Sequence, residues 1–567
     1  MTMEGLQSSL WIGKKKHWTT LCAKCLSWTP MDRQNRKNKV CCNRLCAVLS
    51  CNRLCPAADK SRVVPVSEVV AVQEGIMEFL PYRKVQVSER DFTVLFVQRS
   101  GHSPRWTLGR RVFSAPSRDL RELWVSALRT CLQQHIRCRP QRLLVFINPF
   151  GGRGHGRKIY QSQVSPLFEL AGISTHVLET ERANHARDHI LKKDLSGFDG
   201  LVCVGGDGMF SELMHGLIGR TQQEAGISEN DPSATLEPCS LRIGIIPAGS
   251  TDCVCFATVG VNDPVTSALH IIIGDSQPLD VCSVHHRDQL MRYSVSLVGY
   301  GFYGDVLEES DRHRWMGPVR YDYSGVMMFL SNRSYQGTVE FQLAGNQLTS
   351  PRDKTRCLSG CQVCSASREW LCSVSDLSFD TISQDSFQTP GGSTEEGASS
   401  PWRSVEGRFR AVSLTCMSSA CPKSPAGLSP SAHLADGTAD LILVRDCSPC
   451  GFLTHLSRHT NSKDQFDLPF VDVYRVKALR FTPPCGDEDE EEGEVERGRE
   501  PSSQRKKRHL CGGGCGDAPP RSCWNCDGEV LPHSAILARV HCQLVRLFAR
   551  GIEGPFRNQR DGRRRYR

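Results

Sequence analysis

The sequence predicts an α/β lobe and a mainly antiparallel β lobe, preceded by a smaller domain of strands and one helix. Between residues 141 and 279 of the 567-residue chain, strand-like runs alternate with helical patterns, which is typical of a parallel sheet covered on both faces. Residues 280–552 are richer in strand patterns and predict antiparallel pairing. Residues 1–140 combine short strand patterns with one amphipathic helix.

The composition favours a protein of a reducing compartment. No run approaches the roughly 18 apolar residues that a membrane-spanning helix needs, and the first residues lack the apolar core of a signal peptide. The 28 cysteines are therefore expected as thiols or metal ligands, and disulfides are the less favoured use. The net charge of +9 lies in local clusters without interleaved aromatic residues, so nucleic acid is not an expected partner.

The first domain ends in a helical pattern over Ser117–Cys131, whose apolar side chains recur three and four positions apart. Trp124 lies on this apolar face and is expected in the core. Strands before the helix are predicted at residues 9–12, 67–72, 84–87, 92–98 and 105–109. This order of strands and one helix resembles a pleckstrin-homology domain, a β-barrel closed by a C-terminal helix, and the resemblance implies a membrane-targeting module.

A cysteine-rich stretch, residues 22–55, interrupts this domain. It holds Cys22, Cys25 and five further cysteines at a spacing that fits no regular zinc finger. A loose loop insertion is the favoured interpretation. A tetrahedral thiolate zinc site is the alternative.

The α/β lobe begins at Arg142 and alternates regularly. Strands are predicted at residues 143–148, 174–179, 201–204 and 242–246, and helices at residues 160–171, 184–193, 209–218 and 264–273. Right-handed crossovers between parallel strands bring the strand ends to one edge of the sheet.

The β lobe is predicted to contain strands at residues 293–298, 337–343, 407–415, 439–444, 470–481 and 536–546. Two inserts, residues 375–406 and 484–522, have the composition of disordered segments. Residues 553–567 form a basic tail.

Three strand ends in the α/β lobe carry turns that suit phosphate. They are residues 148–156 (NPFGGRGHG), 205–208 (GGDG) and 247–252 (PAGSTD). Glycine-rich turns let backbone N–H groups point at phosphate oxygens, and a following helix adds a favourable dipole. The first turn is not a P-loop, because no Gly-Lys-Ser/Thr follows it. Since ligands gather at the carboxyl ends of parallel strands, the three turns together predict a nucleotide crevice.

Asp207, in the second turn, is the candidate catalytic residue. An acid flanked by residues without Cβ atoms lies where a substrate can approach the backbone closely. Its carboxylate can accept a proton from an attacking hydroxyl. The alternative is that Asp207 only caps the following helix.

Longer stretches resemble the lipid kinases that share the diacylglycerol-kinase catalytic fold, which are related to the sphingosine kinases, and most closely the ceramide kinases. These stretches are VCVGGDGMFSE (202–212), IIPAGSTDCVC (245–255), SVSLVGYGFYGD (294–305) and CWNCDGEVL (523–531). The resemblance covers about residues 143–346 and 407–550. The cysteine-rich stretch and the arginine tail are not part of it.

The resemblance implies a two-sided site. ATP would lie on Asn148, Pro149, Phe150, Thr180, Glu181, Arg182, Ala183, Asn184, Glu212, Gly249, Ser250, Thr251, Arg314, Arg320, Asp527, Gly528 and Glu529. The acceptor hydroxyl would be bordered by Gly205, Gly206, Asp207 and Gly208, with Asp207 as general base. Asp305 would bind the lipid head group, although sphingosine kinases place this acid two positions later, at what is Leu307 here. Without the resemblance, Arg314 and Arg320 are ordinary surface residues and Glu212 is a solvated helix position.

Two further segments carry alternatives. Cys357, Cys361 and Cys364 are spaced so that three thiolates converge on a metal or a redox centre, and a metal would need a fourth ligand from elsewhere. The resemblance implies that this cluster matters for activity. Residues 452–459 (FLTHLSRH) resemble a calmodulin-binding segment of the family, while core packing is the favoured interpretation.

The expected function is that of the ceramide-type lipid kinases, which transfer the γ-phosphate of ATP to the primary hydroxyl of membrane ceramide. ATP and magnesium are the expected cofactors, with calcium stimulation as an option. Expected partners are phosphoinositide head groups at the first domain, and calmodulin as an option. The expected location is the cytoplasm, peripherally bound to plasma or Golgi membranes. The alternatives are a sphingosine or diacylglycerol kinase and an inactive phosphoinositide-binding adaptor.

Overall fold

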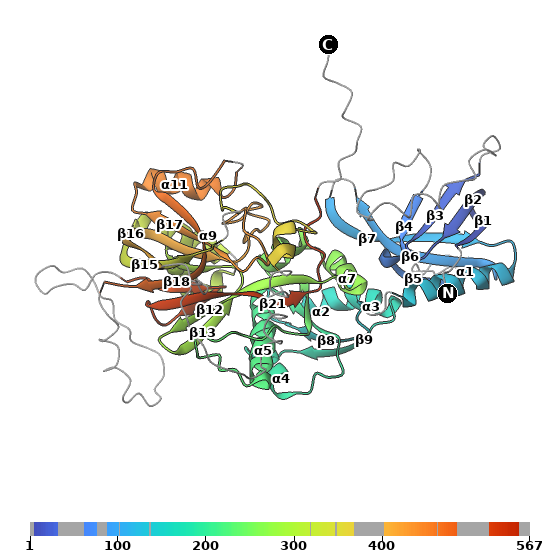
Figure 1. Cartoon of the computed structure of the whole chain (residues 1–567), viewed down its shortest axis with the longest axis horizontal. Coiled ribbons are helices and arrows are strands. Elements are labelled where there is room, and N and C mark those ends of the chain that lie inside the picture. The colour runs from blue at the N-terminus through green and yellow to red at the C-terminus, as the bar shows by residue number, and fades with distance from the viewer. Residues whose placement is uncertain are drawn as a thin grey trace, which may run out of the picture.

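The computed structural model describes residues 5–31, 62–75, 88–100, 103–134, 138–152, 154–317, 319–345, 349–367, 402–461, 463–484 and 521–554. Two sheets organise these residues (Figure 1). A seven-stranded sheet is built from residues 6–114, and a fourteen-stranded sheet is built from residues 142–547.

The first sheet is antiparallel, with the strand order β4-β3-β2-β1-β7-β6-β5. Its strands are β1 (Leu6–Ile12), β2 (Lys15–Leu21), β3 (Cys25–Pro30), β4 (Arg62–Pro65), β5 (Val69–Glu74), β6 (Asp91–Ser100) and β7 (Ser103–Ser114). Helix α1 (Arg118–Gln133) begins after Ser117, whose side chain accepts a hydrogen bond from the backbone N–H of Leu120 at 3.2 Å. Trp124 is fully buried and stacks on Phe92, which confirms its predicted place in the core.

The prediction of a loose insertion at residues 22–55 is wrong at its start. Strand β3 lies within this stretch and pairs with β2, so that Leu26 stands opposite Leu21. Both leucines are buried in the core of the first sheet. Leu26 and Trp28 alternate with less buried residues, so the strand signal is present, but it is only six residues long and lies among closely spaced cysteines. Residues 32–61, with the other cysteines of the stretch, lie outside the described residues, as does the strand predicted at residues 84–87.

The parallel part of the second sheet has the strand order β11-β10-β8-β9. Its strands are β8 (Arg142–Ile147), β9 (Ser174–Glu179), β10 (Gly200–Gly205) and β11 (Arg242–Pro247), and they confirm the four predicted strands. Its helices are α2 (Gly156–Ile159), α3 (Ser165–Leu170), α4 (His185–Lys192), α5 (Asp207–Ala225), α6 (Cys253–Val259) and α7 (Pro264–Ile273). Alternate strand residues pack on opposite faces of the sheet. Leu144 and Cys203 lie in the core with α4 and α5, and Val145 and Val202 lie in the core with α3 and α7. Helices therefore cover both faces, as the alternating pattern predicts.

The remaining strands of the second sheet continue it in antiparallel pairing. They are β12 (Gln277–His286), β13 (Gln289–Ser294), β14 (Val298–Gly301), β15 (Tyr335–Leu343), β16 (Trp402–Thr415), β17 (Ala439–Arg445), β18 (Val471–Thr482), β19 (Trp524–Cys526), β20 (Glu529–Leu531) and β21 (Ile536–Leu547). Strand β21 joins the two parts, because it pairs parallel with β11 and antiparallel with β12 and β18. Backbone hydrogen bonds thus run from one lobe into the other.

Helices of the β lobe that are not among the predicted elements include α8 (Phe302–Arg312), α9 (Val319–Ser331) and α11 (Pro449–Arg458). Phe329 of α9 stacks on Phe452 of α11. Phe452 and His455 are buried, so the favoured interpretation of residues 452–459 as core packing is confirmed. Among the described residues no single helix has the length and apolar character to cross a bilayer, and one bent pair, α6 with α7 at 57°, meets both conditions jointly.

The strand predicted at residues 293–298 is wrong, because β13 ends at Ser294 and β14 begins at Val298. The carboxylate of Asp527 accepts the backbone N–H groups of Val295, Ser296 and Leu297 at 2.7–3.0 Å. Amides that are bound by a carboxylate cannot pair in a sheet ladder, so the strand is interrupted there.

The structure also corrects the predicted boundaries of the two inserts. Strand β16 starts at Trp402, so residues 402–406 belong to the sheet and not to a disordered segment. Ser522, predicted as the end of the second insert, is buried and donates a hydrogen bond to Asp305. Residues 368–401 and 485–520 lie outside the described residues.

The two sheets meet around Trp106 of β7, which is 1% exposed. Its ring stacks on His270 of α7 with the ring centroids 3.8 Å apart, and the guanidinium groups of Arg99 and Arg550 lie over it at 4.5 and 4.9 Å. Its indole N–H donates to Glu553 at 2.9 Å, and Arg99 pairs with the same carboxylate at 2.8 Å. Glu553, predicted within the basic tail, thus lies in this junction.

Candidate active site

The three glycine-bearing turns meet at one edge of the parallel strands. Strand β10 pairs with β8 on one side and β11 on the other, and Gly205 stands level with Pro247. The backbone N–H of Asn148 donates to Val204 at 3.0 Å, and that of Ala248 donates to Gly205 at 3.0 Å. The structure therefore brings the turns after β8, β10 and β11 together.

The turns pack so closely that side chains are excluded between them. A Cβ atom on Gly249 would lie 2.5 Å from the Cα atom of Gly206, and one on Gly152 would lie 2.4 Å from the carbonyl oxygen of Ala248. Gly152 also has a φ of +61°, which disfavours any other residue. The Asn148 side chain accepts the N–H groups of Phe150 and Gly151, both at 2.9 Å, and fixes the first turn.

Asp207 is the first residue of α5 and is half-buried. The N-cap of α5 is Gly206, and the Asp207 carboxylate accepts the backbone N–H groups of Cys253 and Val254 at 3.0 and 2.9 Å, at the start of α6. The alternative of a cap for its own helix is therefore wrong. Burial raises the pKa of Asp207, although these two N–H groups favour its ionised form. The result is a carboxylate that is held in place and is more basic than usual.

Asp252 is a second acid at the three turns, and sequence reasoning assigned it no role. Burial, together with the charge of Asp207, raises the pKa of Asp252 to about 7. Its backbone is left-handed, with φ 52°, and its side chain accepts the N–H of Gly249 at 2.9 Å. The only signal in the sequence is an acid that ends the third turn, because the nearness of Asp207 depends on strand pairing.

The segment after β9 lies beside the first turn. The backbone N–H of Thr180 donates to Ile147 at 2.9 Å, and Asn184 is the left-handed N-cap of α4. Glu212 of α5 lies near this segment, and the backbone N–H groups of Asn184 and Ala186 favour the ionised form of its carboxylate, which lowers its pKa. Burial is the larger effect and raises the pKa of Glu212. Glu181, Arg182 and Ala183 are exposed between these anchors.

The turn at residues 527–529 returns to α5 from far along the chain. Arg292 of β13 donates to Ser211 of α5 at 3.2 Å and lies 3.9 Å from Glu529. The charge of Asp527 contributes to raising the pKa of Asp207, after burial. Arg292 is a residue that sequence reasoning missed, and no motif marks it.

The other predicted residues are more loosely connected to the three turns. Phe150, Ser250 and Thr251 are exposed at the tips of their turns. Arg314 is exposed and pairs with Asp311 at 3.2 Å, while Arg320 is half-buried and donates to the Tyr321 hydroxyl. The structure does not bring these two arginines into contact with the three turns.

Asp305 lies on α8 and is buried. Its carboxylate accepts the hydroxyl groups of Tyr335 and Ser522, both at 2.5 Å. Burial raises the pKa of Asp305, and these two hydroxyls act in the opposite direction. Leu307, two positions later on the same helix, is also buried.

Comparison with known proteins gives matches along most of the chain. Family models match for the ceramide kinase PH domain at residues 6–128, the diacylglycerol kinase catalytic domain at residues 142–284 and the ceramide kinase C-terminal domain at residues 362–557. The chain is 51% identical to ceramide kinase of Mus musculus over 465 residues, which are 82% of this chain and 84% of that protein. It is 48% identical to ceramide kinase of Homo sapiens over 494 residues, which are 86% of this chain and 88% of that protein.

A solved structure described as a putative diacylglycerol kinase from Bacillus anthracis str. Sterne also matches, with 13% identity and a TM-score of 0.44, over 72% of this chain and 98% of that chain. The matched models confirm the predicted pleckstrin-homology domain and the diacylglycerol-kinase catalytic core. With relatives near half identity that are covered over most of their length, the chain belongs to the ceramide kinase family of lipid kinases.

Proposed function

We propose that this chain transfers the γ-phosphoryl group of ATP to the primary hydroxyl of ceramide, with Asp207 as the general base. The observation that carries the proposal is the place of Asp207, a half-buried and unusually basic carboxylate beside three closely packed glycine-bearing turns. The similarity to ceramide kinases supports the choice of acceptor. The ceramide oxygen attacks the γ-phosphorus, Asp207 takes the hydroxyl proton, and the bond to ADP breaks.

The nucleotide is assigned to the three turns and to the residues beside them. In this proposal Asn148, Gly249 and the segment from Thr180 to Asn184 hold ATP, and Glu212 fixes that segment. Magnesium is held in proteins by one or two carboxylates together with substrate phosphates, so Asp252, the acid that ends the third turn, fits this ion. When bound, it would neutralise charge on the phosphates.

Ceramide is nearly insoluble in water, so we infer that the acceptor reaches the site from a membrane. Helix α9 carries an unusual number of exposed apolar side chains, among them Val326 at 58% and Leu330 at 69% exposure, and Trp315 just before it is 81% exposed. Helix α8 next to it carries Asp305, which we assign to the head group. We propose that α9 contacts the bilayer where ceramide enters.

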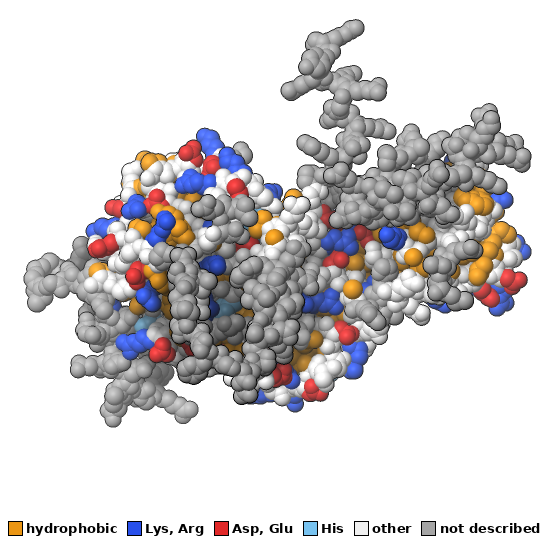
Figure 2. Space-filling model, viewed as in Figure 1, with side chains coloured by type: hydrophobic (Ala, Val, Ile, Leu, Met, Phe, Trp, Pro, Cys, Tyr) orange, Lys and Arg blue, Asp and Glu red, His pale blue; other side chains and the backbone are white. Residues whose placement is uncertain are grey.

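The first domain supplies a second membrane contact in this proposal. Lys14, Lys15 and Lys16 are exposed around the turn between β1 and β2, and Trp11 and Trp18 beside them are 41% and 44% exposed. Figure 2 shows hydrophobic side chains gathered on this domain, at the right of the view. Basic residues next to exposed aromatic rings suit an anionic membrane surface, including phosphoinositide head groups. We therefore expect a cytoplasmic protein that is peripherally bound to membranes.

The proposed function is tested by supplying ceramide, sphingosine and diacylglycerol in matched vesicles with labelled ATP and magnesium. Ceramide is expected to be labelled preferentially. Preferential labelling of sphingosine or diacylglycerol would overturn the acceptor assignment. Vesicle binding without phosphate transfer to any of the three lipids would instead support an inactive adaptor.

The paired acids predict how activity depends on pH. The pKa values of Asp207 and Asp252 are raised. Full ionisation of both carboxylates therefore needs a higher pH than an ordinary aspartate does, whose pKa is about 4. We expect kcat/KM to fall as pH decreases through about 7, the pKa of Asp252. Asp252→Asn removes a negative neighbour and is expected to move this loss of activity to lower pH. The measurement is kcat/KM against pH for the wild type and for Asp252→Asn, and an unshifted profile would contradict the coupling of the two acids.

The proposed membrane contact of α9 predicts that substitutions on this helix lower activity only when ceramide is presented in vesicles. Val326→Glu combined with Leu330→Glu is expected to lower the rate on ceramide in vesicles at least ten-fold, because losing the insertion of two apolar side chains costs more than about 1.4 kcal/mol. The rate on a short-chain ceramide dispersed in water is expected to stay within two-fold. Val177→Glu, at an exposed apolar residue of β9 in the α/β lobe, is the control and is expected to retain the wild-type rate on both substrates. Equal losses on both substrates would contradict a role of α9 in docking.

A further inference from the structure

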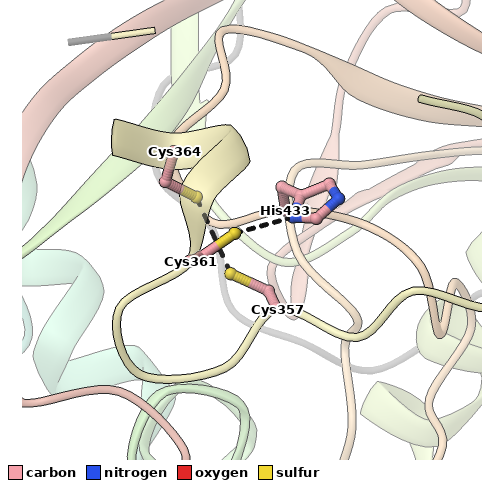
Figure 3. A group of neighbouring side chains, drawn as sticks. All are labelled: Cys357, Cys361, Cys364 and His433. Atoms are coloured by element: carbon pink, nitrogen blue, oxygen red, sulfur yellow. Dashed lines mark hydrogen bonds between the residues drawn. The ribbon is translucent and has the colours of Figure 1, made fainter. Parts of the chain in front are cut away.

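Three cysteines and one histidine come together away from the three turns (Figure 3). Cys357, Cys361 and Cys364 lie on one short loop and the helical turn that follows it, and His433 comes from the loop before β17. The four ligand atoms lie within 4.8 Å of one another. Among the described residues, this is the one group of three or more histidine, cysteine or acidic side chains with such spacing.

The distances within the group suit a tetrahedral ion. The Sγ atoms of Cys357 and Cys364 are 3.7 Å apart, and the Sγ atom of Cys361 is 3.3 Å from Nδ1 of His433. A tetrahedral zinc ion with bonds of about 2.3 Å to sulfur and 2.0–2.1 Å to nitrogen separates two sulfurs by about 3.8 Å and a sulfur from a nitrogen by about 3.5 Å. Only small side-chain movements are needed to reach these separations.

The histidine side of the group is held independently of the cysteines. His433 is 1% exposed, and its ring nitrogen Nδ1 points at Cys361, as Figure 3 shows. Arg475 donates to the carbonyl of Ser431 at 2.7 Å, and the backbone N–H of Asp280 donates to the carbonyl of Leu434 at 2.7 Å. A buried imidazole is thus presented on a fixed loop with one nitrogen toward the thiols.

The cysteine side is held to the same neighbours. The side-chain amide of Gln543 in β21 donates to the carbonyls of both Cys364 and Ala435, at 3.2 and 3.1 Å. The backbone N–H of Ser359 donates to Ile552 at 2.8 Å. One residue of the central sheet therefore sets the spacing of the two loops that carry the ligands.

We propose that Cys357, Cys361, Cys364 and His433 bind one zinc ion as a closed structural site. Zinc prefers a set of three thiolates and one imidazole, while calcium and magnesium prefer oxygen. Four protein ligands leave no position open for a substrate, so the ion holds the two loops together and does no chemistry. Zinc on Nδ1 places the proton of His433 on Nε2, which has no hydrogen-bond partner among the described groups.

The proposed zinc site would link two loops that lie far apart in the sequence. The cysteines follow β15, and His433 precedes β17, so the ion would connect segments about 70 residues apart in sequence. Cys364 packs into the same core as α5, the helix that begins with Asp207. The proposed zinc therefore stabilises the frame of the catalytic lobe.

The experiment is a metal analysis of the purified full-length chain. We expect about one zinc ion per chain by elemental mass spectrometry, and its release when the thiols are titrated with a mercurial. Cobalt added after chelation is expected to produce the visible absorption of tetrahedral thiolate-bound Co²⁺. These readouts use the wild type, so they do not depend on whether a variant folds, and they are independent of kinase activity.

Variants locate the ion. Cys361→Ala and His433→Ala are expected to weaken zinc binding at least about ten-fold, since even outer-shell changes cost this much. His433→Cys keeps four ligands and is expected to retain zinc. Cys450→Ser, at an exposed cysteine outside the group, is the matched control. Wild-type protein without zinc or cobalt binding, or with a disulfide between Cys357 and Cys364 in unreduced peptide maps, would overturn the proposal.

Discussion

Asp207→Asn is expected to lower kcat for ceramide phosphorylation by about 10²–10⁴-fold, the usual contribution of a general base. Asparagine keeps the size of the side chain but cannot accept the hydroxyl proton. It also offers one acceptor oxygen where the carboxylate accepts two backbone N–H groups, from Cys253 and Val254. The measurement is single-turnover phosphate transfer at saturating ATP and ceramide.

The loss must be separated from a change in folding or recruitment. The melting temperature, vesicle binding and ATP binding of Asp207→Asn are therefore measured alongside the rate. Vesicle and ATP binding are expected to stay within two-fold of the wild type, because Asp207 borders the acceptor side of the crevice in the proposed site. Turnover within two-fold of the wild type would rule out Asp207 as the base.

Gly249→Ala is expected to reduce kcat/KM for ATP by about 10²-fold. The added Cβ atom would lie 2.5 Å from the Cα atom of Gly206 and 2.6 Å from the carboxylate of Asp252, well inside the contact distance of about 3.5 Å. The Gly206 Cα atom belongs to the backbone and cannot be moved away by a side-chain rotation, so the second and third turns must move apart. A displacement near 1 Å at a reacting centre costs about 10²-fold in rate.

Gly345→Ala is the matched control, because a Cβ atom at this position meets open space. It makes the same change of residue in the loop after β15, far along the sequence from the three turns. Both variants are compared by ATP kinetics and by thermal unfolding. Equal activity of the two variants would show that the close packing of Gly206 and Gly249 is not needed for the reaction.

The parallel part of the fold is readable from the sequence because its signals are local. Strands β8, β10 and β11 are each a short apolar run followed by a glycine-bearing turn and a helical pattern, so they could be placed within one or two residues. Strand β3 and the break between β13 and β14 are different. Their structure depends on a hairpin partner and on Asp527, which lies more than 200 residues away in sequence.

The same difference between local signals and long-range contacts applies to the candidate active site. The GGDG motif identifies Asp207, and glycines that follow predicted strands identify the three turns. Each of these signals lies within one short segment of the sequence. The raised pKa of Asp252 depends on burial and on Asp207, and the position of His433 depends on Gln543 and Arg475. Neither the pKa of Asp252 nor the position of His433 is determined by neighbouring residues in the sequence. The sequence therefore predicts three cysteine ligands and leaves the fourth ligand open.

The junction around Trp106 has a consequence for experiments that divide this protein. Cutting the chain between α1 and β8 would expose the Trp106 indole on one fragment and would separate Arg99 from Glu553 and Glu68 from Arg550. Exposing a large aromatic surface and stranding half-buried charges are both destabilising. An amino-terminal deletion that loses activity would therefore report damage to the remaining fragment as well as the missing membrane contact. Point substitutions on the outer surface of the first sheet separate the two effects.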